Sequence, residues 1–187
     1  MEPIDTEYKG YRFRSRLEAR WAVFFQHLGV EWQYEPEGYE FENGTRYLPD
    51  FYLPYTYSTY SDETYVEVKP EGTTDTKGWD ITSRENEAEL SFARSLILLS
   101  GRPRAVDDEQ ADYINLNYKG HVYEDNIQYF CQCPKCKTIG FEFNGRAERI
   151  QCSCSIFETH TQDAPRLPKA YNAASKARFE HGESGVV

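Results

Sequence analysis

The chain has 187 residues, of which 39% are hydrophobic and 16% aromatic, and its formal net charge at pH 7 is −10. This length suffices for one good core and a small satellite unit, but excludes two large domains. The net charge argues against a large basic surface for nucleic acid, and no segment has the pattern of a signal peptide or a membrane span.

The first predicted helix begins near Ser15. Ser15 and Glu18 have the spacing of a capping box, and Gly29 has the position of a residue that ends a helix. The apolar residues between them recur at helical spacing: Leu17, Trp21, Phe24, Phe25 and Leu28. We therefore expect an amphipathic helix that buries an aromatic face.

Extended segments follow this helix. Residues 30–34 form a short predicted strand, and residues 39–53 form a predicted hairpin whose Asn43-Gly44 pair favours a type I′ turn. The segment Val66–Lys69 alternates apolar and charged residues, which is typical of a half-buried strand. Tyr39 to Glu42 and Thr45 to Leu53 are the two expected arms of the hairpin.

The remaining segments are predicted in turn to form a charged helix over residues 81–94, a buried strand over 95–100 and an amphipathic stretch over 113–117. A cysteine-rich unit begins near residue 129. A last helix is expected over residues 169–180, beyond Pro165 and Pro168. The order of the core elements is thus helix, three strands, helix, strand, which indicates an α/β fold.

Three polar residues lie in the middle of this core. Asp50 follows Pro49, and Glu67 and Lys69 end the alternating strand. If the two strands are neighbours, both carboxylates reach one site, where they repel each other unless a cation lies between them. Mg²⁺ prefers such oxygen ligands, and a nearby lysine can act on the attacked phosphate or the attacking water.

Four ordered motifs carry a family resemblance: FRSRLEARW, WQYEP, YLPDFYLP and YVEVKP. Together they resemble the PD-(D/E)XK nucleases of the restriction-endonuclease-like fold, and among these the phage endonuclease I type of Holliday-junction resolvase. The likeness spans residues 11–101. It implies an αβββαβ core with a mixed sheet and a Mg²⁺- or Mn²⁺-dependent endonuclease, of phage or bacterial type, that hydrolyses DNA.

The resemblance also implies roles for single residues. Asp50 and Glu67 match the metal-ligand carboxylates, Lys69 the catalytic lysine, and Glu18 the helix glutamate that completes the magnesium site. The capping box explains Glu18 equally well without a metal.

The DNA contacts expected from the sequence are less specific. Arg14 and Arg16 are candidates to hold DNA phosphates as bidentate donors, although arginines at a helix start are usually solvated. Tyr55, Tyr57 and Tyr60 are candidates to stack on bases.

Four of the five cysteines form two close pairs: Cys133 with Cys136, and Cys152 with Cys154. A hairpin turning at Asn144-Gly145 would bring the pairs together, as a tetrahedral zinc site requires. We therefore predict a structural zinc ribbon in a reducing cytoplasm, with Cys131 or His160 as alternative ligands. Buried free thiols are the other interpretation.

The sequence thus predicts a nuclease core over residues 1–125, a zinc ribbon over 126–160 and a C-terminal helical tail over 161–187. The partner is DNA, with structure-selective cleavage of junctions, flaps or nicks left open, and a homodimer left open as well. The alternative is a catalytically silent nuclease fold that binds DNA or protein, such as a phage inhibitor of a host system.

Overall fold

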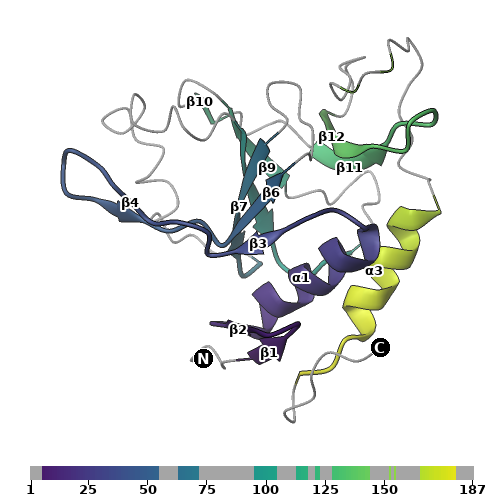
Figure 1. The fold of residues 1–187 in the computed structure, drawn as a ribbon, viewed down its shortest axis with the longest axis horizontal. Helices are drawn as coiled ribbons and strands as arrows, with labels where there is room; N and C mark the ends of the chain where they lie inside the picture. Colours follow the sequence, from purple (N-terminus) through teal and green to yellow (C-terminus); the bar gives the residue numbers. More distant parts are fainter. Residues whose placement is uncertain are drawn as a thin grey trace.

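The computed structural model describes residues 6–54, 63–71, 95–104, 113–117, 121–122, 128–143, 152, 154 and 165–179. Within this part of the chain, two helices lie side by side next to a twisted mixed sheet (Figure 1). Four predicted features lie outside the described residues: the helix over 81–94, the tyrosines at 55, 57 and 60, the turn at 144–145, and His160.

Helix α1 (Arg16–Leu28) begins and ends where the sequence predicts. The Ser15 hydroxyl accepts the backbone N–H of Glu18 at 3.2 Å, and Gly29 closes the helix in the left-handed conformation with φ 74°. Of the five residues of the predicted apolar face, Leu17 is half-buried and the other four have no solvent exposure: Trp21, Phe24, Phe25 and Leu28. The cap and the apolar spacing together determine this helix.

Gly29→Ala should lower the free energy of unfolding by about 1 kcal/mol, because alanine disfavours a positive φ. An added Cβ would also meet Nη2 of Arg166, whose exposed side chain can move aside. Gly29→Asn should cost less than Gly29→Ala, although it is larger, because asparagine tolerates the left-handed region. Chemical denaturation of both variants measures the difference, and equal losses would contradict this account of the cap.

The main sheet has the strand order β10-β9-β8-β7-β6-β3. Its strands are β3 (Gln33–Tyr34), β6 (Phe51–Pro54), β7 (Glu63–Lys69), β8 (Ser95–Ser100), β9 (Tyr113–Asn117) and β10 (His121–Val122). Strands β7 and β8 are parallel and every other pair is antiparallel, which confirms a mixed sheet in an α/β protein. Phe25 of α1 packs on Phe51 of β6 with ring centroids 5.2 Å apart.

Strand β7 confirms the predicted alternation. Val66 and Val68 are buried in the core shared with α1, whereas Glu67 and Lys69 are partly exposed on the other face. Pro70 follows directly, and because proline has no backbone N–H it cannot donate a hydrogen bond to a neighbouring strand, so β7 ends before it. The carbonyl of Lys69 accepts the backbone N–H of Gly101 at 2.8 Å, so β7 and β8 end together. Glu67 and Lys69 therefore lie at the end of a strand anchored on both sides.

The predicted hairpin over 39–53 is only partly correct. Strands β4 (Tyr39–Glu40) and β5 (Arg46–Tyr47) do pair, but their turn is not type I′, because only Gly44 of the Asn43-Gly44 pair has a positive φ. The Asn43 side chain accepts the N–H of Thr45 at 2.9 Å, and Gly44 donates to the Phe41 carbonyl at 2.8 Å. The Phe41 N–H donates to the Thr45 carbonyl at 2.9 Å, so residues 42–44 form a three-residue loop.

The second arm of that hairpin is also divided, whereas the sequence predicts one strand over residues 45–53. Strand β5 pairs with β4, and β6 pairs with β7 and β3 in the main sheet. Pro49 lies between the two strands and has no N–H to donate to a ladder, which accounts for the break. Asp50, next to it, therefore lies in a bend rather than in a strand.

A true type I′ geometry occurs at an unpredicted hairpin near the N-terminus. Strands β1 (Thr6–Tyr8) and β2 (Tyr11–Phe13) pair around Lys9 and Gly10, which have φ values of 52° and 82°. Phe13, the last residue of β2, is fully buried in the core, and its ring centroid lies 4.3 Å from that of Tyr34. The next residue, Arg14, is thereby held close to the start of α1.

The C-terminal segments join the same core. Strands β11 (Gln128–Gln132) and β12 (Ile139–Phe143) form a hairpin. The ring centroid of Phe24 lies 5.0 Å from that of Phe130 in this hairpin and 4.6 Å from that of Tyr171. Side chains from all three predicted units, 1–125, 126–160 and 161–187, therefore belong to one hydrophobic cluster. In the described part of the chain, no helix is both long and apolar enough to cross a membrane.

Helix α3 (Arg166–Lys176) differs from the prediction of 169–180. It begins three residues earlier because Pro168 lies in its first turn, where a backbone N–H is not needed. It ends at Lys176 because Ala177 is already extended, with φ −58° and ψ 130°. The buried side of α3 packs along α1: Leu167, Ala170, Tyr171, Ala173 and Ala174.

Candidate active site and cysteine cluster

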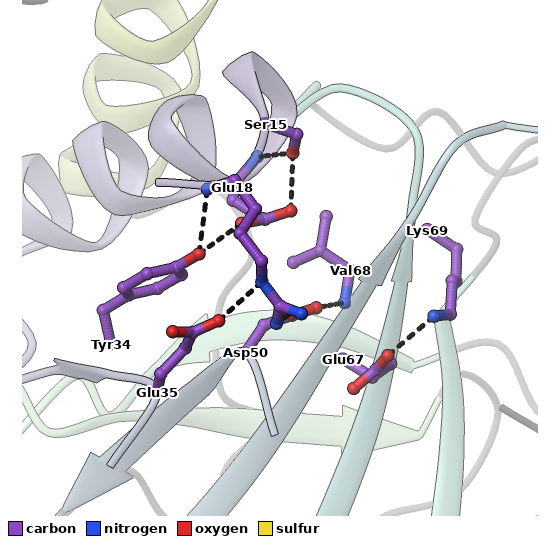
Figure 2. Close-up of polar contacts among 9 residues, drawn as sticks. Ser15, Glu18, Tyr34, Glu35, Asp50, Glu67, Val68 and Lys69 are labelled. Atoms are coloured by element: carbon purple, nitrogen blue, oxygen red, sulfur yellow. Dashed lines mark hydrogen bonds and ion pairs between the residues drawn. The ribbon is translucent and has the colours of Figure 1, made fainter. Parts of the chain in front are cut away.

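Asp50 lies directly before β6, beside the end of β7. The register pairs Phe51 with Val66, so its continuation by one residue sets Asp50 opposite Glu67. The Asp50 side chain is buried, and its Oδ2 accepts the backbone N–H of Val68 at 2.7 Å. Figure 2 shows this contact. The break after β5 and the pairing of β6 with β7 thus turn a buried carboxylate toward the strand that carries Glu67.

Glu67 and Lys69 point to the same side of β7, as residues two apart in a strand must. Lys69 Nζ donates to Glu67 Oε1 at 2.7 Å, with the two side chains 24% and 12% exposed (Figure 2). Burial, then the charges of Glu67 and Asp50, and a hydrogen bond to Glu67 raise the pKa of the Tyr47 phenol well above its ordinary value. The Glu67 carboxylate therefore lies close to both Lys69 and Tyr47.

Glu18 lies in the first turn of α1 and faces the same region. Its two carboxylate oxygens each accept a hydroxyl at 2.6 Å, Oε1 from Ser15 and Oε2 from Tyr34 (Figure 2). Burial, and next the hydrogen bond to Glu18, raise the pKa of Tyr34, so the phenol stays a donor. Glu18 therefore belongs to the helix cap and also places a carboxylate at the site, and both of its oxygens already accept hydrogen bonds within the protein.

The exposed Arg14 side chain reaches back to Asp50. Its Nη2 donates to Asp50 Oδ1 at 3.2 Å, and its Nε forms an ion pair of 2.5 Å with Glu35 Oε1. The backbone N–H of Arg14 donates to the Tyr34 hydroxyl at 3.1 Å. Arg16 is half-buried at the first position of α1, and no polar contact recorded among the described residues joins it to these carboxylates.

The carboxylates influence one another electrostatically. Burial, and then the charges of Glu67 and Glu18, raise the pKa of Asp50 well above its ordinary value, against the opposing effects of Val68 N–H and Arg14. This arrangement favours a proton or a cation at Asp50. The three predicted carboxylates therefore belong to one neighbourhood, although their oxygens do not all lie within 4.8 Å of one another.

Tyr34, Glu35 and Tyr47 also belong to this site, and none of them is predicted from the sequence as a site residue. A signal for the first two was present, because WQYEP is one of the four motifs of the resemblance. Glu35 has a positive φ of 45°, and its N–H donates to the Asp50 carbonyl at 2.9 Å. A non-glycine residue in this region is uncommon and is held there by its surroundings.

The four predicted zinc ligands do come together. Sγ atoms of Cys133, Cys136, Cys152 and Cys154 all lie within 4.8 Å of one another, and in the described residues no other His, Cys, Asp or Glu group of three or more does so. A tetrahedral zinc with Zn–S bonds of about 2.3 Å needs sulfur atoms roughly 3.8 Å apart. The cluster is thus compatible with a structural zinc.

The first cysteine pair lies on the loop that connects β11 and β12. Cys133 exchanges backbone hydrogen bonds with the far side of this loop, donating to the Thr138 carbonyl at 2.9 Å and accepting from Lys137 N–H at 3.0 Å. Burial, and then hydrogen bonds with Cys133 and Cys136, raise the pKa of Cys152 to about 12. Against the effect of burial, hydrogen bonds with Thr138, Cys133 and Cys154 lower the pKa of Cys136 to about 6. One thiol of the cluster is thus easily ionised while Cys152 keeps its proton, and a bound dication would favour the thiolate form of all four.

Cys131 is not part of the cluster. It is fully buried within β11, two residues before Cys133, and its thiol donates to the Gly140 carbonyl at 3.7 Å. This position removes Cys131 as a replacement ligand in the described structure.

Comparisons of the chain with protein-family models, with curated proteins and with solved structures find no match. The nuclease resemblance therefore depends on the four sequence motifs and on the chemistry of the residues at this site.

Proposed function

We propose that the chain is a divalent-metal-dependent DNA endonuclease of the PD-(D/E)XK type, with a restriction-endonuclease-like core. The observation that carries this proposal is the burial of Asp50 beside the Glu67–Lys69 end of β7. Two carboxylates and a lysine at paired strand ends have the donor set and the charge needed to hold a cation against a phosphodiester.

Asp50 and Glu67 are the residues that would hold Mg²⁺ or Mn²⁺. The fit is supported by the negative charge around the buried Asp50 carboxylate, because burial and then the charges of Glu67 and Glu18 raise the pKa of Asp50. A bound cation would polarise the scissile phosphate and lower the pKa of a bound water. Glu18 could join only if Ser15 or Tyr34 released one of its oxygens.

Lys69 supplies the positive charge at the reacting phosphate. Its ammonium group is held by Glu67 Oε1, and its side chain is 24% exposed, so the lysine is both oriented and partly accessible. A preoriented cation stabilises the charge that develops in the transition state without reorganising during the reaction. In this role Lys69 acts on turnover rather than on the affinity for DNA.

We also propose that the four clustered cysteines hold one structural zinc ion. Four thiolates leave no open coordination position, which is the character of a structural site. The exposed lysines of this loop, Lys135 and Lys137, flank the cluster and would lie at a surface able to approach a phosphate backbone.

A second candidate function is a nuclease fold that binds DNA or protein without cleaving it. The specific observation in its favour is that Asp50 already has a cation, Arg14, and that both oxygens of Glu18 accept hydroxyls. Carboxylates that are satisfied within the protein need no metal. The two candidates differ in whether DNA is cleaved.

The test is incubation with duplex, nicked, flap and four-way DNA in the presence of Mg²⁺ or Mn²⁺. Lys69→Ala should lower kcat by about 100-fold or more, because an oriented charge at the transition state is lost, while the Kd for DNA changes about twofold at most. Lys176→Ala removes the same charge from an exposed site on α3 and should leave both constants unchanged. Absence of cleavage on every substrate would favour the binding module instead.

A further inference from the structure

Arg14 occupies the cation position of the most buried carboxylate at the site. Its side chain is 56% exposed, whereas that of Asp50 is only 7% exposed, so the guanidinium covers the carboxylate from the solvent side. Of the two Asp50 oxygens, Oδ2 accepts the Val68 N–H at 2.7 Å and Oδ1 accepts Arg14 at 3.2 Å. The oxygen that faces away from β7 is therefore the one that Arg14 holds.

The backbone on both sides of this ion pair is fixed, whereas the arginine side chain can leave. The backbone N–H of Arg14 donates to the Tyr34 hydroxyl, and the N–H of Glu35 donates to the Asp50 carbonyl. The backbone at Arg14 and at Asp50 can therefore stay in place when the Arg14 side chain moves. Glu35 offers the guanidinium a second carboxylate, 28% exposed, at the outer edge. Arg14 can thus release Asp50 and keep a partner.

We infer that Arg14 is a displaceable counter-ion of Asp50, which competes with a divalent cation for Oδ1 and turns outward when the cation binds. This inference depends on the proposed function, because it assumes that Asp50 holds the cation. A metal at about 2.1 Å from Oδ1 and a guanidinium on the same oxygen would bring two positive charges into contact. Once displaced, the guanidinium lies at the rim of the site, where it can hold a DNA phosphate.

A purely structural role for Arg14 predicts the opposite sign. If the ion pair only orients Asp50, its loss should weaken both the fold and cation binding. If Arg14 competes with the cation, its loss should destabilise the metal-free protein and tighten cation binding. The sign of the change in affinity therefore separates the two roles.

The experiment is calorimetric titration of the zinc-loaded protein with Mn²⁺ alone, without DNA. Arg14→Ala should bind Mn²⁺ about three- to tenfold more tightly than the parent, as expected for the loss of one partly exposed charge pair. Arg14→Lys, which keeps the charge but not the two-pronged geometry, should lie between them. Lys176→Ala, which removes an exposed positive charge from α3, is the control and should change the affinity about twofold at most.

Asp50→Asn identifies the binding event that belongs to this site. Equal or weaker Mn²⁺ binding by Arg14→Ala, together with binding that Asp50→Asn removes, overturns the inference and leaves the proposed function standing. Absence of Asp50-dependent binding in every protein overturns both. Circular dichroism of each variant shows whether it is folded. If Arg14→Ala does not fold, the affinity of Arg14→Lys for Mn²⁺ is compared with that of the parent protein instead.

Discussion

Asp50→Asn should abolish DNA cleavage, with a loss in kcat of at least about a thousandfold. The amide keeps the shape of the side chain, but it removes the charge that would hold the cation. Metal sites contribute several kcal/mol of transition-state stabilisation, and each 1.36 kcal/mol is a factor of ten in rate. Single-turnover cleavage of the best substrate, with Mg²⁺ and separately with Mn²⁺, measures the loss.

Two further variants make this result specific. Glu40→Gln applies the same chemical change to an exposed carboxylate of the β4–β5 hairpin, and should cleave like the parent. Glu18→Gln should cost about 1 kcal/mol of stability or less and keep activity if Glu18 only caps the helix. If Glu18→Gln loses activity while its stability is unchanged, Glu18 is a metal ligand. Cleavage by Asp50→Asn at the parent rate would remove the catalytic proposal altogether.

The elements that the sequence predicts well are those determined by neighbouring residues. Helix α1 follows from the cap at Ser15, the left-handed Gly29 and an apolar face at helical spacing. Strand β7 follows from strict alternation up to a proline. In both cases local conformation and burial favour the same structure, so no information from distant residues is needed.

The errors arise where two local signals compete or where a partner is distant in the sequence. Asn43-Gly44 has the composition of a type I′ turn, but the Asn43 side chain accepts a hydrogen bond from the Thr45 N–H, which stabilises a different turn geometry. The single predicted strand over 45–53 contains Pro49, which divides it. Helix α3 starts before Pro168 because a first turn tolerates proline.

At the candidate site, the sequence indicates which residues have useful chemistry but not what each one contacts. The motifs predict that Asp50, Glu67 and Lys69 lie near the ends of neighbouring strands, and the register of β6 and β7 sets Asp50, in the bend before β6, opposite Glu67. The direction of the Arg14 side chain depends on Asp50, 36 positions away, and on the unusual backbone of Glu35. A phosphate-binding role and a counter-ion role have the same sequence pattern, and only tertiary contacts distinguish them.

The cysteine cluster shows the same limit at a larger scale. Pair spacing predicts that four sulfur atoms meet, and they do. Spacing does not reveal that the hairpin bearing them contributes to the main core, where Phe130 is 2% exposed and lies 5.0 Å from Phe24 and 6.3 Å from Phe25. A separate ribbon would unfold alone, whereas this hairpin shares its hydrophobic cluster with α1.

Cys136→Ser should therefore remove the bound zinc and lower the free energy of unfolding of the whole chain by several kcal/mol. Cys136 is exposed, so loss of its thiol alone should change stability by about 0.5 kcal/mol or less. A larger effect must come from the metal, since the binding energy of structural zinc is folding energy. Elemental analysis and chemical denaturation of reduced protein measure both quantities.

The contact of Phe130 with α1 determines how far this effect should extend. Zinc removal should lower the melting temperature in one transition and reduce hydrogen-exchange protection in α1, because Phe130 packs on Phe24 and Phe25. Cys131→Ser is the control in the same hairpin: its thiol contacts the Gly140 carbonyl, so zinc content should be unchanged. Freshly purified, reduced parent protein without zinc would contradict the site. Zinc loss that leaves protection of α1 intact would instead make the hairpin an independent unit.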